Sequence, residues 1–290
     1  MPLVTPFRHG AVDHAALKAL VQRLRGTGIA GFVACGSTAE AGALDALEQD
    51  AVLATVIEHA AGLPVVMGLS GCHMGQVLAR VRSLAPQPLA GLLVPAPHSI
   101  RPSQAGLQQW FRAIADASAV PLIVYDIPYR TGATLDLATL RSLAAHPNLR
   151  AVKDCGGSAA KTQALIADGA LQVLAGEDAQ AFTTVALGGA GAIAASAHWQ
   201  TAEWVDCLDA VAAGDLERAR RLWQAIVPWV EMCFAEPNPA PIKALLAAQG
   251  EMADELRAPM ASASPALVQR LQQALAALPR GEPSAAPMGD

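Results

Sequence analysis

Aromatic residues and lysine are both scarce in this chain. Phe, Trp and Tyr together make up 4% of the 290 residues, so Ala, Leu and Val must fill most of the core. A net charge of -5 argues against a surface that binds nucleic acid or an anionic membrane. No run approaches the ~18 uninterrupted apolar residues of a membrane span. With 53% apolar and 16% charged residues, the composition predicts a globular protein with a large core.

Paired cysteines and metal-ligand motifs are also missing. The five cysteines stand at irregular positions without a CxxC pair, which is typical of a protein in a reducing cytosol. The seven histidines show neither HxH nor HExxH spacing, and acidic residues do not gather at strand ends beyond Glu177-Asp178. No signal peptide is visible before Thr5. We therefore expect a cytoplasmic protein with no metal site, no nucleic-acid partner and no membrane partner.

Short apolar runs alternate with helical patterns over roughly the first 210 residues. The expected strands lie at residues 3–4, 31–35, 64–68, 89–94, 121–125, 150–153, 171–175 and 191–195. Eight strand–helix units predict an α/β fold, a (β/α)8 TIM barrel over residues 1–213. An open doubly wound sheet is the alternative. It usually has fewer units and carries a glycine fingerprint after its first strand, where this chain has Thr5-Pro6-Phe7.

The alternation stops at about residue 214, and three helical patterns follow. They lie near residues 216–226, 242–246 and 266–278. We expect a C-terminal helical appendage over residues 214–279. Residues 280–290 are rich in Pro, Ser and Gly, which predicts a disordered tail.

One lysine lies where a barrel enzyme carries its chemistry. Lys18 and Lys161 fall in helical segments, where a solvated ammonium is expected. Lys153 instead closes the apolar run Ala151-Val152 and precedes a Gly-Gly turn, at the C-terminal end of a strand. In a dry site the pKa of its amine falls, and a neutral amine forms a Schiff base with a ketone. The alternative is an exposed lysine paired with Asp154.

Three further strand ends would face the same mouth of the barrel as Lys153. A phenol such as that of Tyr125 can pass protons if its hydroxyl has partners, and Ser37 and Thr38 could supply them. The alternative for these two hydroxyls is capping of the next helix. Arg130 precedes a Thr-Gly turn, so its guanidinium either grips a substrate carboxylate at the mouth or is an ordinary surface arginine. The remaining strand end is Gly176-Glu177.

These stretches, in this order, resemble the dihydrodipicolinate synthase / N-acetylneuraminate lyase family of pyruvate-dependent class I aldolases. Residues 125–132 (YDIPYRTG) resemble the family's Y-N-x-P-x-R-T-G, residues 152–154 (VKD) its Schiff-base motif, and residues 36–40 (GSTAE) its G-T-T-G-E. Residues 236–243 (EPNPAPIK) and 256–260 (LRAPM) are similar to segments typical of the synthase branch. The resemblance covers nearly the whole chain, and the set of motifs is specific for the family.

The resemblance implies roles for individual residues. Lys153 would condense with pyruvate, while Tyr125 would move protons together with Thr38 and Ser37. Arg130 would hold the carboxylate of the second substrate, L-aspartate 4-semialdehyde, in lysine and diaminopimelate biosynthesis. Backbone groups near Gly176 and Ile193 would line the pyruvate pocket. The resemblance implies no metal and no separate cofactor, because the iminium is the electron sink. Family members are commonly homotetramers built from two tight dimers. We therefore expect a homotetramer or a homodimer.

This sequence departs from the family pattern at several positions. Ser99 stands where synthases carry a loop tyrosine that reaches into the neighbouring subunit's relay. Asp126 replaces the usual Asn, and Ala39 replaces a Gly. The expected first strand is short, because the chain begins at its end. The lysine-feedback pocket of regulated synthases uses polar residues where this chain has other side chains, so we expect no strong inhibition by lysine; those positions are Ala46, Gln49, Cys72 and Gln76.

Three functional hypotheses remain open at this point. The first is the synthase, which residues 236–243 and 256–260 favour. The second is another pyruvate-dependent aldolase, lyase or hydratase-aldolase of the family that acts on a sugar acid or other 2-oxo acid, which Ser99 favours. The third is a catalytically weak homologue that binds a keto acid as a sensor or scaffold. The presence together of Lys153, Tyr125, Thr38 and Arg130 disfavours it.

Overall fold

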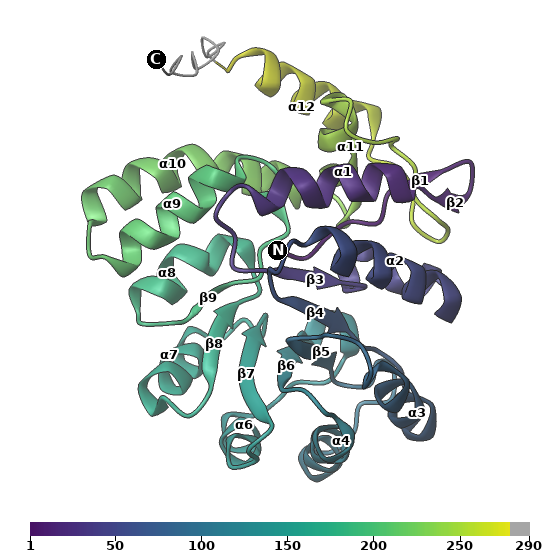
Figure 1. Ribbon diagram of the computed structural model, residues 1–290. Coiled ribbons are helices and arrows are strands. Elements are labelled where there is room, and N and C mark those ends of the chain that lie inside the picture. Colours follow the sequence, from purple (N-terminus) through teal and green to yellow (C-terminus); the bar gives the residue numbers. More distant parts are fainter. Residues whose placement is uncertain (279–290) are drawn as a thin grey trace, which may run out of the picture.

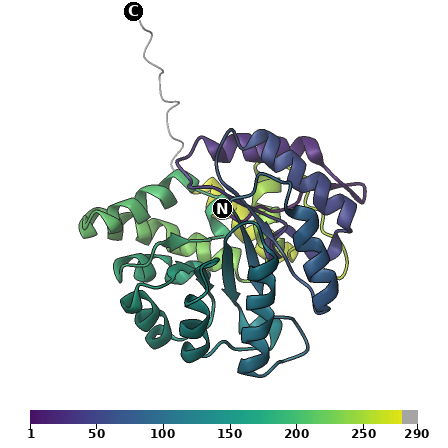
Figure 2. The same cartoon turned by 60° about the horizontal axis from the view of Figure 1, so that its bottom comes forward.

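The computed structural model describes residues 1–278. Its main feature is a parallel sheet of seven strands in sequential order, β3 to β9, curved around a common centre with helices outside it (Figures 1 and 2). The strands are β3 (Phe32–Ala34), β4 (Val65–Gly68), β5 (Gly91–Pro95), β6 (Leu122–Asp126), β7 (Leu149–Asp154), β8 (Gln172–Ala175) and β9 (Gly191–Ala192). Seven of the eight expected strands are therefore confirmed, and their succession is that of the predicted (β/α)8 barrel.

Helices connect the strands and form the outer layer. In chain order they are α1 (His14–Arg25), α2 (Ala46–His59), α3 (Met74–Leu84), α4 (Gln104–Ala117), the short α5 (Pro128–Thr131), α6 (Leu137–Ala144), α7 (Ala159–Asp168), α8 (Ala181–Ala186) and α9 (Thr201–Ala212). Short 3-10 turns stand at η1 (Ser37–Ala39), η2 (Ala41–Ala43), η3 (Asp178–Gln180) and η4 (Ser196–His198). Side chains cap the N-termini of several helices. At α2, for example, Asp45 and Glu48 form a reciprocal capping box.

The first strand is where the expectation was wrong. Residues 3–4 form no strand. Instead, Pro2 makes a single parallel bridge to Val33 of β3, supported by a 3.0 Å hydrogen bond from Leu3 N to Val33 O. The chain then turns into a small antiparallel hairpin, β1 (Phe7–Arg8) and β2 (Ala11–Val12), which the apolar pattern did not predict. Two residues per strand leave too little alternation to recognise.

Three helices follow the barrel units, as expected. They are α10 (Leu216–Cys233), α11 (Ala240–Ala248) and α12 (Pro265–Ala276). Helix α10 packs along α9, and α11 and α12 lie beyond α1 in Figure 1. The division of the chain at residue 213 stays a prediction. The expected disordered tail, residues 280–290, lies outside the described residues.

The four lysines differ in their exposure to solvent. Lys18 is exposed on α1, as expected. The expectation that Lys161 is solvated is wrong, because only 9% of this residue on α7 is exposed. Lys153 and Lys243 are buried as well. A buried ammonium needs a partner or a lowered pKa, so each of these three positions has a physical consequence.

Candidate active site

Tyr125 and Lys153 lie side by side at the C-terminal ends of β6 and β7. They are direct partners in the parallel register, and both are 6% exposed. The Lys153 Nζ atom lies 4.3 Å from the centre of the Tyr125 ring. Side chains alternate along a strand, so these two face the lumen while Asp126 and Asp154 face the helices. The two residues that were predicted to do the chemistry are therefore brought together inside the barrel.

The surroundings of Lys153 favour its neutral form. Burial lowers the pKa of this amine; Cys155, Asp178 and Glu177 act in the opposite direction, and Arg130 adds to the lowering. The alternative of an exposed lysine paired with Asp154 is wrong. The Asp154 carboxylate instead accepts hydrogen bonds from the Gly156 backbone N–H, at 2.8 Å, and from the Thr162 hydroxyl.

Gly176 provides the space in which the Lys153 side chain lies. A Cβ atom on Gly176 would come within 2.9 Å of Lys153 Cγ and 2.4 Å of Cys155 Sγ. Its backbone N–H donates to Asp154 O at 2.9 Å, which fixes the crossing from β7 to β8. The Ile193 backbone N–H donates to Ala175 O, also at 2.9 Å, and the Ile193 side chain belongs to the apolar cluster around Tyr125. Both predicted backbone positions thus adjoin the lysine and tyrosine.

The hydroxyl groups of the expected relay are placed differently from each other. Thr38 is buried in η1, and its Oγ1 accepts a hydrogen bond from Asn238 Nδ2 at 3.1 Å. Ser37 is exposed. Neither hydroxyl caps a helix, because Gly36 is the N-cap residue of η1 and Asp45 is that of α2. Within the described part of the chain, no hydrogen bond joins either hydroxyl to Tyr125, so a direct relay is not formed in this conformation.

Tyr125 is a protonated phenol here. Burial is the main cause that raises its pKa well above the ordinary value, with smaller contributions from Cys155 and Tyr129. A phenol that stays protonated can donate a hydrogen bond or a proton to a developing oxyanion, and can take the proton back later.

A cleft of about 430 Å³ lies beside Tyr125. Its walls include Ser37, Ser99, Tyr125, Arg130 and Asn238. Arg130 stands on the short helix α5 and is exposed, so its guanidinium is free to meet an anion that enters from solvent. The Ser99 backbone N–H donates to Thr131 O at 3.2 Å, which holds the loop after β5 against α5. Ser99, which the resemblance aligns with the family's loop tyrosine, therefore belongs to the wall of the cleft.

Sequence reasoning missed the residues that fasten the C-terminal region to the cleft. Lys243 Nζ lies 2.7 Å from Glu40 Oε1, and both side chains are buried. The other Glu40 oxygen accepts the Arg257 backbone N–H at 3.1 Å. Asn238, on the same C-terminal region, reaches Thr38 directly. The motifs at 236–243 and 256–260 are the available signal, but as sequence they indicate only a branch of the family.

Neither a metal centre nor a membrane segment emerges from the described residues. Among residues 1–278, no group of three or more His, Cys, Asp or Glu side chains is placed to hold a metal ion. Of the helices within the same range, none has the length and apolar character required to cross a bilayer.

Comparison with known proteins agrees with this geometry. The model of the dihydrodipicolinate synthetase family matches residues 1–278. Among curated relatives, 4-hydroxy-tetrahydrodipicolinate synthase 2 of Clostridium acetobutylicum is 33% identical, over 95% of this chain and 98% of its own. The 4-hydroxy-tetrahydrodipicolinate synthase of Trichlorobacter lovleyi is 36% identical, over 93% and 94%.

A solved structure gives the same result for the fold. The chloride-inhibited dihydrodipicolinate synthase of Acinetobacter baumannii, complexed with pyruvate, superimposes with a TM-score of 0.92 at 29% identity. The match covers 95% of this chain and 96% of that one. The (β/α)8 barrel with C-terminal helices is thereby confirmed, and the chain belongs to the dihydrodipicolinate synthetase family.

Proposed function

We propose that this protein is a 4-hydroxy-tetrahydrodipicolinate synthase, a Schiff-base-forming carbon–carbon lyase that condenses pyruvate with L-aspartate 4-semialdehyde. The observation that carries the proposal is the buried Lys153 amine beside the ring of Tyr125, a residue that lines a cleft together with Arg130. The curated relatives bear this enzyme's name, and the Acinetobacter structure holds pyruvate. The pathway we propose is lysine and diaminopimelate biosynthesis.

In the proposed reaction the neutral Lys153 amine adds to the C2 carbonyl of pyruvate. Uptake of one proton and loss of water leave an iminium ion, which makes the pyruvate methyl group acidic. Removal of one methyl proton gives an enamine, whose carbon attacks the aldehyde carbon of the second substrate. One carbon–carbon bond forms, the aldehyde oxygen takes up a proton, and an iminium with Lys153 is left. The amino group of the second substrate then adds to the iminium carbon, and the bond from that carbon to Lys153 breaks, which restores the lysine amine. The iminium is the electron sink, so the scheme includes no metal and no separate cofactor.

Tyr125 is the proton carrier in this scheme, and Thr38 and Ser37 are its partners. Asn238 supports this assignment for Thr38, because it donates to the Thr38 hydroxyl and so directs that hydroxyl's own proton elsewhere. Ser37 lines the cleft. We assign Arg130 to the carboxylate of the aldehyde substrate, and the backbone around Gly176 and Ile193 to the pyruvate pocket.

A second candidate is a pyruvate-dependent lyase or hydratase-aldolase that acts on a sugar acid or another 2-oxo acid. Ser99 favours it, since a serine at the cleft leaves room that the family's tyrosine would fill. A coupled assay decides between the two. We expect turnover with pyruvate plus aspartate semialdehyde that exceeds turnover with every member of a panel of sugar acids. Faster cleavage of a sugar acid would replace the first proposal with the second.

We also propose a cytoplasmic homo-oligomer, either a dimer or a tetramer. Five unpaired cysteines support a reducing compartment. Leu47 and Ile100 are 80% and 57% exposed, which supports an interface with another subunit.

A further inference from the structure

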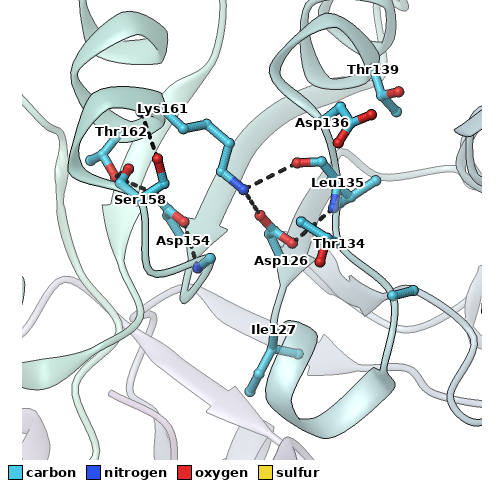
Figure 3. Close-up of polar contacts among 12 residues, drawn as sticks. Asp126, Ile127, Thr134, Leu135, Asp136, Thr139, Asp154, Ser158, Lys161 and Thr162 are labelled. Atoms are coloured by element: carbon cyan, nitrogen blue, oxygen red, sulfur yellow. Dashed lines mark hydrogen bonds and ion pairs between the residues drawn. The ribbon is translucent and has the colours of Figure 1, made fainter.

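A buried ion pair lies directly behind the proposed catalytic pair. Lys161 on α7 reaches the end of β6, where its Nζ contacts Asp126 Oδ2 and lies 3.1 Å from Leu135 O (Figure 3). Asp126 is 1% exposed. Asp126 follows Tyr125 in the chain, and the register partner of Asp126 on β7 is Asp154, which follows Lys153. The ion pair therefore stands on the outer face of the two strand ends that carry the lysine and the tyrosine.

The same pair closes the turn that carries Arg130. Asp126 Oδ1 accepts the Leu135 backbone N–H at 3.4 Å, while Lys161 binds the Leu135 carbonyl. Residues 127–134 are thereby joined at both ends, at Asp126 and at Leu135. On the inner side, the Asp126 carbonyl accepts the Cys155 backbone N–H at 2.8 Å, which links β6 to the segment just after Lys153.

The chain leaves no free space around this pair. A Cβ atom on Gly156 would lie 2.5 Å from Lys161 Nζ and 2.6 Å from Asp126 Oδ2. Burial raises the pKa of Asp126, and Lys161 acts against that rise. Since both partners are out of water, removal of either one leaves an uncompensated buried charge.

We propose that Asp126 and Lys161 are positioning residues that hold the turn 127–134, and with it Arg130, at the distance from Lys153 that the carboxylate of the second substrate requires. They touch neither substrate. This inference rests on the proposed function for the role of Arg130, whereas the attachment of the turn rests on the contacts alone. An asparagine at position 126 would keep the bond to Leu135 but could not hold the lysine as an ion pair.

The decisive variant is the double substitution D126N/K161M. Each single substitution leaves one member of the pair as a lone buried charge and is expected to destabilise the fold, whereas the double variant leaves neither member charged. We expect its melting temperature to return close to that of the wild type. We expect its KM for the aldehyde to stay raised roughly tenfold or more, because a small misplacement of a binding group is enough for that, while KM for pyruvate changes less than about threefold. Lys18→Met, which removes an exposed lysine, is the matched control.

A purely structural role would behave differently. Recovery of both the melting temperature and the aldehyde KM in the double variant would overturn the proposal. Hydrogen exchange of residues 127–135 gives a readout that needs no substrate: faster exchange in the folded double variant supports the attachment, and unchanged exchange refutes it. If the wild-type enzyme turns over no aldehyde, the proposed function fails, and the exchange measurement still decides whether the pair holds the turn.

Discussion

Among residues 1–278, Lys153 is the one buried lysine that forms no ion pair. Lys161 and Lys243 each make an ion pair, with Asp126 and Glu40. Lys153 has the Tyr125 ring beside it instead. Burial without an ion pair disfavours the charged form of this amine. The neutral form is the nucleophile, and burying an amine is a liability for folding.

The substitution Lys153→Met tests this liability through its pH dependence. The pKa of Lys153 is lowered in the folded state from 10.5, so between the lowered value and 10.5 the unfolded chain binds more protons, and wild-type stability rises with pH. Methionine removes this term. We expect K153M to be more stable at pH 7 by on the order of 1 kcal/mol, with the gain vanishing as the pH approaches 10.5. Urea unfolding at several pH values measures it, and a wild type more stable than K153M at pH 7 would contradict it.

Gly176→Ala tests the packing of the lysine side chain. The added methyl group would meet Cys155 Sγ and Lys153 Cγ, so Lys153 must move. We expect turnover to fall by roughly a hundredfold, the effect of about 1 Å of misplacement. Cys155→Ala in the same chain should restore part of the activity by making room. Gly26→Ala, whose Cβ would meet only Arg23 O at 3.7 Å, is the control. Full activity in G176A would refute this account of the site.

At the level of elements, the C-terminal helices and the cleft form one unit. Residues 236–260 connect to η1 and η2 through Glu40, Lys243, Arg257 and Asn238. These bonds bring segments about two hundred residues apart onto the loop that carries Ser37 and Thr38. The C-terminal region therefore has a role in shaping the cleft as well as in covering the barrel.

Glu40→Gln tests that attachment. The variant leaves the buried Lys243 ammonium without its carboxylate, which we expect to lower the free energy of unfolding by about 3–5 kcal/mol. Asp206→Asn, which breaks the exposed pair with Arg218, should change it by less than about 1 kcal/mol. Chemical denaturation of both variants provides the comparison. Equal losses of the free energy of unfolding in the two variants would show that the buried pair stabilises the fold no more than the exposed pair does.

The local sequence pattern predicted the strands and the pair Lys153 and Tyr125. It did not predict the buried ion pairs that join distant segments around them. Continuous apolar runs predicted eight strands, of which seven form, and the rule that barrel chemistry lies at strand ends selected Lys153 and Tyr125. The burial of Lys161 and Lys243 could not be predicted in this way, because their partners lie 35 and 203 residues away along the chain. The prediction of a strand at residues 3–4 was wrong for a related reason. The single bridge formed there, between Pro2 and Val33, depends on β3 and not on the residues of the expected strand.

For the whole molecule, the account predicts catalysis without strong control by lysine. Gln49 stands at one of the positions where regulated synthases carry other polar groups. Its side-chain amide nitrogen donates to Ala41 O and Leu44 O at 3.1 and 3.3 Å. Its amide is thus already engaged by the chain. Lysine added to the coupled assay at cellular concentrations should leave the rate unchanged, and clear inhibition there would contradict the prediction.

The central claim is that Lys153 captures pyruvate covalently. Borohydride reduction in the presence of labelled pyruvate, followed by mass spectrometry of the peptides, tests it most directly. The account predicts one reduced pyruvyl group per chain, on Lys153, and none on Lys18, Lys161 or Lys243. A chain that remains unlabelled, or that carries the label on any other lysine, would contradict it.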